Sequence, residues 1–349
     1  MGRVKRMTFA AFMARALYDP TTGYYARYGP GRDYRTAPQT SPAFGHLIGA
    51  ALAHMWRALG EPARFVAVEP GAGDGRLAAG AVAYLRARAP AAARAIRYVA
   101  LDRRPAACPG FVVGDAGALP VAPVEGCVLS NELFDALPVH RLVGRRDGLT
   151  ELWVEQRAGG PAFVEAPLSD PSLAALLPPL RPGQVADVAP AADAIYAELC
   201  GAVARGFVLT IDYGGEGDEL YGPHRMAGTL VAYRRHRVVD DPLAMPGEQD
   251  LTAHVDFGRL RAVGERHGLR TLAYTSQRRF LLGLGLREWV GRLDPARLST
   301  ADLFNARLGA EELVRRDGLG KLRVLLQARG LADVPAALLA RNEEDRDRQ

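Results

Sequence analysis

Short apolar runs alternate with longer amphipathic stretches through the middle of the chain. The apolar runs predict core strands at 64–69, 96–101, 111–113, 126–130 and 206–211. They are almost continuously apolar, which is typical of parallel strands buried on both faces. Helical stretches at 76–88 and 191–205 fall between them. The alternation of strand, turn and helix predicts an α/β fold with a parallel sheet that helices cover on both sides.

Different patterns flank this core. Near the N-terminus, Thr8 can cap a helix that runs to about residue 17, and a second helix is expected at 43–59. Between the fourth and fifth strands, residues 139–164 have the alternation of antiparallel β structure. From about residue 252 the chain is predicted to be mostly helical.

These changes of pattern divide the chain into consecutive segments. We expect an N-terminal helical lid at 1–60, a core at 61–215 with an insertion near 139–190, a mixed and helical region at 216–340, and a flexible tail at 341–349. No stretch approaches the roughly 18 apolar residues that a membrane-spanning helix needs, so no membrane insertion is expected.

Composition and charge narrow the functional classes. The 349 residues are 48% hydrophobic and 24% charged, which excludes wholesale disorder. The net charge is only +5, and no face interleaves aromatic with basic residues, so no nucleic-acid partner is predicted. Three distant cysteines form neither a metal pair nor a disulfide framework, and the histidines have no metal-binding spacing. Together with an N-terminus that lacks an apolar signal, these features favour a cytoplasmic protein. Composition and charge do not predict the oligomeric state.

The turn after the first core strand is the most informative segment. It runs from Glu69 to Gly75 and contains Gly71 and Gly73, and such a turn lets backbone approach a ligand closely. Its G-x-G-x-G spacing differs from the G-x-G-x-x-G of dinucleotide folds, because Arg76 stands where their third glycine falls. The preceding acid would repel a pyrophosphate and suits a cationic ligand, S-adenosylmethionine. A purely structural turn remains the alternative.

Acidic residues also end the next two strands. Asp102 follows the second strand and could accept both ribose hydroxyls, and Asp115 follows the third and could receive the adenine amino group. Each acid alone could be a solvated loop carboxylate. Together with Glu69 they occupy the carboxyl edge where open α/β sheets bind ligands, which favours a nucleoside-bearing cofactor.

The segment after the fourth strand contains candidate acceptor-site residues. Glu132 and Asp135 are three apart, so a helical turn would place them on one face, and Asn131 can present a carbonyl to a nucleophile. Beside a methyl donor, two carboxylates suggest a cationic acceptor such as arginine, whose guanidinium is a poor nucleophile until carboxylates orient it. An N-capped turn with only a structural role is the alternative.

With these residues in view, the sequence resembles the mitochondrial dysfunction protein A (MidA)-like methyltransferases. The similarity spans roughly residues 8–285 and lies in separated blocks at 12–25, 33–45, 69–77, 131–139, 211–214, 228–236, 250–257 and 277–281. The chain departs from the family pattern at Gln39, where an acid is usual, and at Asp74, where Arg is frequent. It also has Ala72 where the family often has Pro, and Asp102 where Glu is common.

The resemblance implies a class I methyltransferase with a Rossmann-like sheet, an N-terminal helical lid, a β insertion and a helical C-terminal region. It implies S-adenosyl-L-methionine as the cofactor, no metal, Thr36 and Pro38 in the lid over the cofactor, and Asn131, Glu132 and Asp135 in the acceptor pocket. Eukaryotic members are credited with symmetric dimethylation of arginine in a respiratory complex I subunit, so an arginine-bearing protein substrate is expected. Methylation of a small molecule on oxygen or nitrogen, and a non-catalytic assembly factor that binds the cofactor, remain alternatives.

Overall fold

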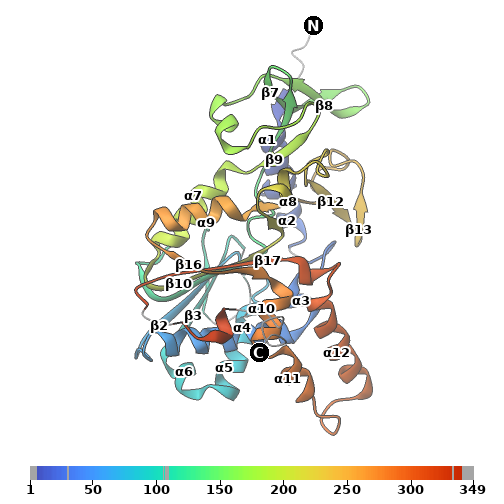
Figure 1. The fold of residues 1–349 in the computed structure, drawn as a ribbon. Coiled ribbons are helices and arrows are strands. Elements are labelled where there is room, and N and C mark those ends of the chain that lie inside the picture. Colours follow the sequence, from blue (N-terminus) through green and yellow to red (C-terminus); the bar gives the residue numbers. More distant parts are fainter. Residues whose placement is uncertain (1–5, 30, 105, 107–109, 332–333, 340–349) are drawn as a thin grey trace. The chain divides into compact units, whose positions relative to one another are not determined.

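The chain forms two units, each assembled from separated segments. A computed structural model describes residues 6–29, 31–104, 106, 110–331 and 334–339 (Figure 1). The accessory unit comprises Met1–Arg35, Phe134–Ala194 and Tyr213–Leu260, and the sheet unit comprises Thr36–Leu133, Ile195–Asp212 and Arg261–Gln349. The sequence predicts four consecutive segments instead. Of these, the expected tail at 341–349 lies outside the described residues.

A seven-stranded sheet forms the centre of the sheet unit, in the order β16-β17-β10-β5-β2-β3-β4. These strands are β2 (Phe65–Pro70), β3 (Ile96–Asp102), β4 (Phe111–Val113), β5 (Val124–Asn131), β10 (Val203–Asp212), β16 (Arg270–Ser276) and β17 (Arg323–Arg329). The five strands from β10 to β4 are parallel and correspond to the five predicted apolar runs. β17 is antiparallel to both of its neighbours. The prediction of a mostly helical C-terminal third therefore missed two strands of the central sheet.

Helices cover both faces of this sheet (Figure 1). The helices of this part of the chain are α3 (Ala37–Thr40), α4 (Pro42–Ala58), α5 (Arg76–Arg88), α6 (Pro90–Ala95), α7 (Pro190–Gly201), α9 (Phe257–Arg266), α10 (Gln277–Gly283), α11 (Leu286–Gly291) and α12 (Thr300–Val314). On the face of α7 and α9, the Tyr196 hydroxyl donates to Oε1 of Gln327 at 2.8 Å, and Nε2 of Gln327 donates to the Arg261 carbonyl at 3.0 Å. These bonds tie both helices to β17, and the predicted α/β class I fold is confirmed.

The accessory unit has a five-stranded antiparallel sheet of its own. Its strands are β1 (Arg6–Thr8), β6 (His140–Arg145), β7 (Gly148–Arg157), β8 (Gly160–Ala166) and β9 (Val185–Val188). The smaller elements are α2 (Tyr24–Arg27), β11 (Gly214–Gly215), α8 (Asp218–Tyr221), β12 (Val231–Arg234), β13 (Arg237–Val239), β14 (Asp250–Thr252) and β15 (Val255–Asp256). Strands β6, β7 and β8 occupy the region where the sequence predicts antiparallel β structure.

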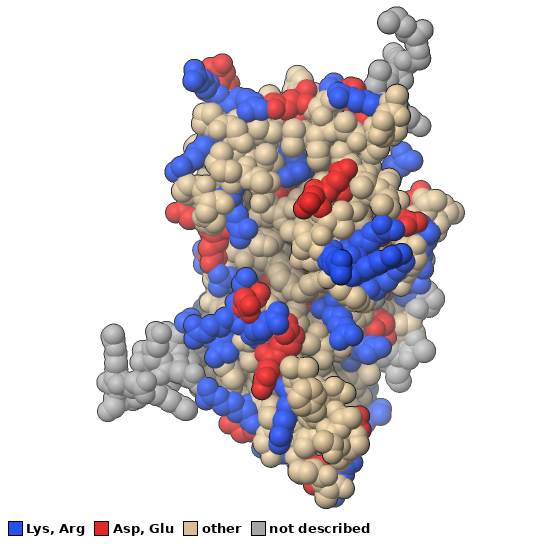
Figure 2. Space-filling model, turned by 90° about the vertical axis from the view of Figure 1, so that its right-hand side faces the viewer, with Lys and Arg blue, Asp and Glu red and all other residues tan. Residues whose placement is uncertain are grey.

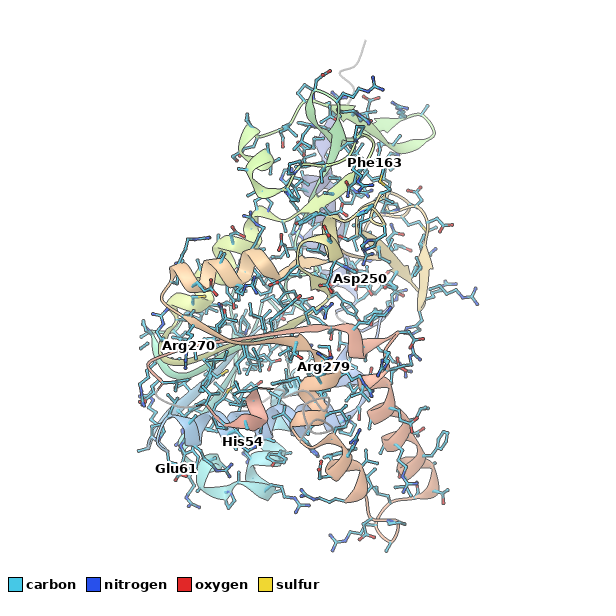
Figure 3. The ribbon with its side chains drawn as sticks, in the orientation of Figure 1. His54, Glu61, Phe163, Asp250, Arg270 and Arg279 are labelled. Atoms are coloured by element: carbon cyan, nitrogen blue, oxygen red, sulfur yellow. The ribbon has the colours of Figure 1, made fainter. Side chains whose placement is uncertain are left out.

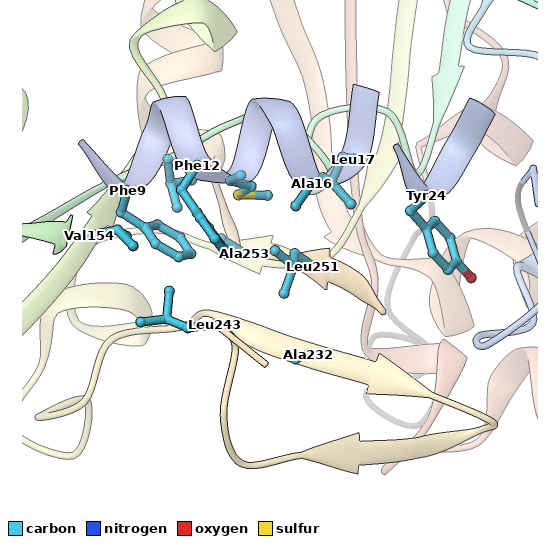
Figure 4. Close-up of a cluster of buried hydrophobic side chains, with 12 residues drawn as sticks. Phe9, Phe12, Ala16, Leu17, Tyr24, Val154, Ala232, Leu243, Leu251 and Ala253 are labelled. Carbon is cyan, nitrogen blue, oxygen red and sulfur yellow. The ribbon is translucent and has the colours of Figure 1, made fainter. Parts of the chain in front are cut away.

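A buried apolar cluster fixes the N-terminal helix α1 (Phe9–Tyr18) inside the accessory unit (Figure 4). Phe9 and Leu17 of α1 are fully buried, together with Leu251 of β14. Burial of a side chain of this size stabilises a fold by about 1.5–3 kcal/mol. As predicted, Thr8 caps the helix, because its Oγ1 accepts the Ala11 N–H at 3.1 Å.

Candidate functional site

The glycine turn joins β2 to α5 in a conformation that requires glycine. Gly71, Gly73 and Gly75 have φ values of 74°, 55° and 78°, a region that residues with a Cβ rarely adopt. The turn is closed by hydrogen bonds from the Ala72 N–H to the Leu101 carbonyl at 3.0 Å and from the Gly75 N–H to the Ala72 carbonyl at 2.9 Å. Exposed backbone and the start of α5 therefore lie at the carboxyl edge of the sheet.

Asp102 lies beside this turn at the end of β3. Its Oδ2 accepts the Gly73 N–H at 2.9 Å, and its Oδ1 accepts the Arg104 N–H at 3.1 Å. The side chain is partly exposed, so its remaining lone pairs can accept hydroxyl groups. The structure thus brings Asp102 to the turn, as the sequence predicts.

Glu69, at the end of β2, is a buried carboxyl with 3% of its surface exposed. The Tyr98 hydroxyl, from the neighbouring strand β3, donates to its Oε2 at 2.7 Å. Burial raises the pKa of Glu69 to about 8. The nearby carboxyls of Asp102 and Asp74 also raise this pKa, whereas the hydrogen bond from Tyr98 lowers it. Among the described residues, no Lys, Arg or His pairs with this carboxyl. The site therefore suits a ligand that brings a positive charge.

Asp115 is held by groups of the protein itself. Its Oδ1 accepts the Gly117 N–H at 2.7 Å, and its Oδ2 accepts Nε of Arg103 at 2.6 Å. Burial alone would raise the pKa of Asp115, but the Gly117 hydrogen bond and the Arg103 guanidinium together lower it. Its contact with an adenine amino group stays a prediction.

The short helix α3 carries the predicted lid residues and contacts two parts of the site. The Ala37 N–H donates to Oε1 of Glu132 at 3.0 Å, and Nε2 of Gln39 donates to Oδ2 of Asp74 in the glycine turn at 3.4 Å. Thr36 is the N-cap residue of this helix and Pro38 lies in its first turn. The two departures from the family pattern, Gln39 and Asp74, therefore contact each other.

Asn131 and Glu132 follow one another at the carboxyl end of β5. Nδ2 of Asn131 donates to Oε1 of Glu132 at 3.0 Å. Oδ1 of Asn131 is buried and has no hydrogen-bond partner in the described chain. Leaving a buried acceptor unsatisfied costs about 1–3 kcal/mol, so this oxygen marks a position where a ligand donor fits.

The backbone at Glu132 contradicts the predicted helical turn. Glu132 has a φ of 49°, which is uncommon for a residue with a side chain, and the described residues 132–138 run as bends and turns. Glu132 therefore lies outside any right-handed helical turn, and the spacing of three residues does not place it on one helical face with Asp135.

Asp135 belongs to the accessory unit, whereas Glu132 belongs to the sheet unit. It is 6% exposed, and its carbonyl accepts the Ala253 N–H at 2.9 Å. The joint action of the two carboxylates on one acceptor stays a prediction.

Two buried polar residues near the predicted site were missed by the sequence reasoning. Tyr98 supports Glu69, and the carboxyl of Asp212, fully buried at the end of β10, accepts the Leu133 N–H at 3.1 Å. Asp212 gives the same strand-end signal as Glu69 and Asp102. A tyrosine within an apolar strand gives no such signal, because it reads as part of the core.

The accessory unit contains a small cavity beside residues of the 250–257 block. It is lined by Phe134, Tyr221, His254, Asp256 and Arg259, among others, and has a volume of about 30 Å³.

Charged side chains are interspersed over much of the face shown in Figure 2, in keeping with the net charge of +5. No cluster of three or more His, Cys, Asp or Glu among the described residues could hold a metal ion. Within the described chain, no helix combines the length and hydrophobicity needed to cross a bilayer.

The strand order with antiparallel β17, the G-x-G-x-G turn and the acids at the ends of β2 and β3 define a class I S-adenosylmethionine-dependent methyltransferase. A family model described as "Putative S-adenosyl-L-methionine-dependent methyltransferase" matches residues 47–109 and 116–275. The chain belongs to this family, and the predicted cofactor and enzyme class are confirmed.

Solved and curated relatives agree with this assignment. A Burkholderia thailandensis protein crystallised with S-adenosylhomocysteine is 31% identical, with a TM-score of 0.84 over 95% of this chain and 90% of that one. Two curated relatives are named "Protein arginine methyltransferase NDUFAF7, mitochondrial". The rat protein is 27% identical over 319 residues, which are 80% of this chain and 71% of the rat protein. The human protein is 28% identical over 320 residues, which are 80% of this chain and 70% of the human protein.

These relatives contradict the predicted cytoplasmic location. The rat, mouse and human proteins are all named as mitochondrial. The prediction was wrong because cysteine usage indicates a redox environment and does not identify a compartment.

Proposed function

We propose that this protein is an arginine N-methyltransferase that acts on a protein substrate. The observation that carries the proposal is the pair at the end of β5: a buried Asn131 Oδ1 without a donor, next to the Glu132 carboxylate. One offers an acceptor to an N–H group and the other a negative charge, which is the combination that a guanidinium requires. The names of the curated relatives support the same acceptor.

In this proposal, S-adenosyl-L-methionine supplies an electrophilic methyl group when it is bound. The turn that contains Gly71, Gly73 and Gly75 lets the backbone approach the cofactor closely. Glu69 contacts the ammonium group of the cofactor, and Asp102 accepts hydrogen bonds from its ribose. The lid residues Thr36 and Pro38 cover it, and Asp115 accepts from the adenine amino group. The partly exposed Asp102, the cation-free Glu69 and the glycine conformations fit such a group.

In this proposal, the acceptor side consists of Asn131 and Glu132 of the sheet unit, and a role for Asp135 stays a prediction from the sequence. Glu132 is held by the N–H of Ala37 and by Nδ2 of Asn131, so its carboxylate is oriented before the substrate arrives. Oδ1 of Asn131 accepts one N–H of the guanidinium, and the Glu132 carboxylate holds the positive charge away from the attacking nitrogen. Catalysis then rests mainly on orientation for in-line attack.

The finer proposal concerns the product and the substrate. By the family resemblance, the product is symmetric dimethylarginine and the substrate is a subunit of respiratory complex I. The test is to incubate the purified protein with methyl-labelled cofactor and a cell lysate, and then to identify methylated residues by mass spectrometry. Symmetric dimethylarginine in a protein fraction is the expected result.

The other outcomes exclude the proposal in different ways. Label confined to the small-molecule fraction would assign a metabolite methyltransferase. Binding of the cofactor, measured by calorimetry, without transfer to any fraction would assign a non-catalytic assembly factor.

A further inference from the structure

Glu69 is a buried carboxyl that lacks a cation in its own unit. It is 3% exposed, and the Tyr98 hydroxyl at 2.7 Å makes the one hydrogen bond that the described residues give it. An ionised carboxylate in such surroundings is costly, because burial removes water without supplying a compensating charge. The free protein therefore favours the protonated carboxyl.

The surrounding groups strengthen this preference. Those that face Glu69 are Tyr98 and Asp102 of β3 and Asp74 of the turn, of which the two aspartates disfavour a further negative charge. Arg76, at the start of α5, pairs instead with Asp74 at 2.8 Å.

No cation is among the groups that shift the pKa of Glu69. On the neighbouring strand β5, burial raises the pKa of the Cys127 thiol. On α4, burial lowers the pKa values of His46 and His54 (Figure 3 labels His54).

Tyr98 is itself 8% exposed and lies on β3, where residue 98 pairs with Ala67 and residue 100 pairs with Glu69. Its hydroxyl reaches diagonally across the two strands to the carboxyl. A hydrogen bond donated to a carboxylate favours the ionised form and fixes its direction. Tyr98 therefore opposes the effect of burial and orients the group.

We propose that Tyr98 is a positioning residue that orients Glu69 toward the cofactor's ammonium group, and that cofactor binding expels a proton from Glu69. The O–H bond of the carboxyl breaks, the proton passes to solvent, and the ammonium keeps its own protons. This inference rests on the proposed contact between Glu69 and the cofactor. It adds Tyr98, which acts without contacting the cofactor, and the release of the Glu69 proton when the cofactor binds.

The first test counts protons by calorimetry on the full chain. S-adenosylhomocysteine is titrated into the protein at pH 7 in buffers of different ionisation enthalpy. 5′-Methylthioadenosine, which lacks the amino-acid part, is the matched probe. We expect release of about 0.9 proton with S-adenosylhomocysteine, because a carboxyl with a pKa of about 8 is mostly protonated at pH 7, and none with 5′-methylthioadenosine. Equal proton counts for the two probes would overturn the proposal.

Two variants separate the roles of the residues. Glu69→Gln should abolish the proton release. Tyr98→Phe should weaken S-adenosylhomocysteine binding about tenfold and leave 5′-methylthioadenosine binding unchanged. The affinity for S-adenosylhomocysteine should also begin to rise at a higher pH than in the wild-type protein, because the hydrogen bond that favours ionisation of Glu69 is lost. Tyr84→Phe is the control, because Tyr84 lies on α5 with a hydroxyl that makes no hydrogen bond to a described residue.

The outcomes distinguish this inference from the proposed function. If Tyr98→Phe weakens both probes equally, Tyr98 has a structural role only and the positioning role is wrong. If neither probe binds the wild-type protein, the proposed cofactor site itself fails. If S-adenosylhomocysteine binds tightly without releasing a proton, the cofactor site stands and the coupling to Glu69 is refuted.

Discussion

The contact between Gln39 of α3 and Asp74 of the glycine turn can be tested by a charge exchange. Nε2 of Gln39 lies 3.4 Å from Oδ2 of Asp74. Gln39→Glu would replace this donor by a carboxylate oxygen at the same distance. Two like charges so placed repel by about 1 kcal/mol at the dielectric of water, which is the appropriate limit because the Asp74 side chain is 41% exposed. The variant should therefore open α3 more easily.

The partner substitution determines whether the effect is electrostatic. Asp74→Arg alone removes the acceptor of Gln39 and the ion pair with Arg76, which lies at 2.8 Å. Combined with Gln39→Glu, it creates an opposite-charge pair at these two positions. The double variant should then be more stable than the sum of the two single effects, with a coupling of about 1 kcal/mol.

Hydrogen exchange is the assay suited to so local a change. The amides of Gln39 and Thr40 donate to the Thr36 carbonyl at 3.1 and 3.0 Å, so their protection reports the opening of α3. Faster exchange in Gln39→Glu and recovery in the double variant are expected. Additive effects of the two substitutions would refute the reasoning, because they would show that the side chains do not interact.

Three further predictions concern other parts of the molecule. Gly73→Val should abolish binding of S-adenosylhomocysteine in calorimetry, because the glycine has a φ of 55°, and unchanged affinity would contradict the assigned turn. Glu132→Gln should keep that binding and lose methyl transfer by about 10²-fold, unlike the control Glu125→Gln at the opposite end of β5; equal loss of both would mean a misassigned residue. Burial raises the pKa of Asp250 (Figure 3) from 3.8 to about 6, so its contribution to stability is lost as pH rises from about 4 to 6. Asp250→Asn should remove that part of the pH dependence in urea denaturation, and an unchanged profile would exclude this origin.

The parallel part of the sheet was predictable because its strands are buried on both faces. Their apolar runs are short, are bounded by turn residues and alternate with helices, which leaves little ambiguity about their type. β17 has the same burial, with five consecutive buried residues, but its sequence lies among helical patterns. Periodicity cannot distinguish such a run from a buried helix. Its place in the sheet is decided by antiparallel pairing with β10 and β16, which no local pattern encodes.

The candidate site was predictable where a rule of topology applies. Acids at the ends of parallel strands must share one edge, and Glu69 and Asp102 do lie beside the glycine turn. The acceptor segment follows no such rule. Its conformation depends on a left-handed residue that is not glycine, Glu132, whose N–H donates to the Ile211 carbonyl at 2.9 Å. A spacing of three residues therefore indicated a helical face that the backbone does not form.

The division of the chain into units bears on which acceptor residues the proposal needs. Asn131 and Glu132 lie in the same unit as the glycine turn and α3, and Glu132 is linked to α3 by a hydrogen bond of 3.0 Å. The four-residue helix α3 thus makes both contacts: Gln39 contacts the glycine turn, and Ala37 contacts Glu132. Orientation of the donor side and of the first acceptor residues therefore depends on contacts inside the sheet unit. The acceptor residues that these contacts orient are therefore Asn131 and Glu132, whereas the described backbone contact of Asp135 lies in the accessory unit.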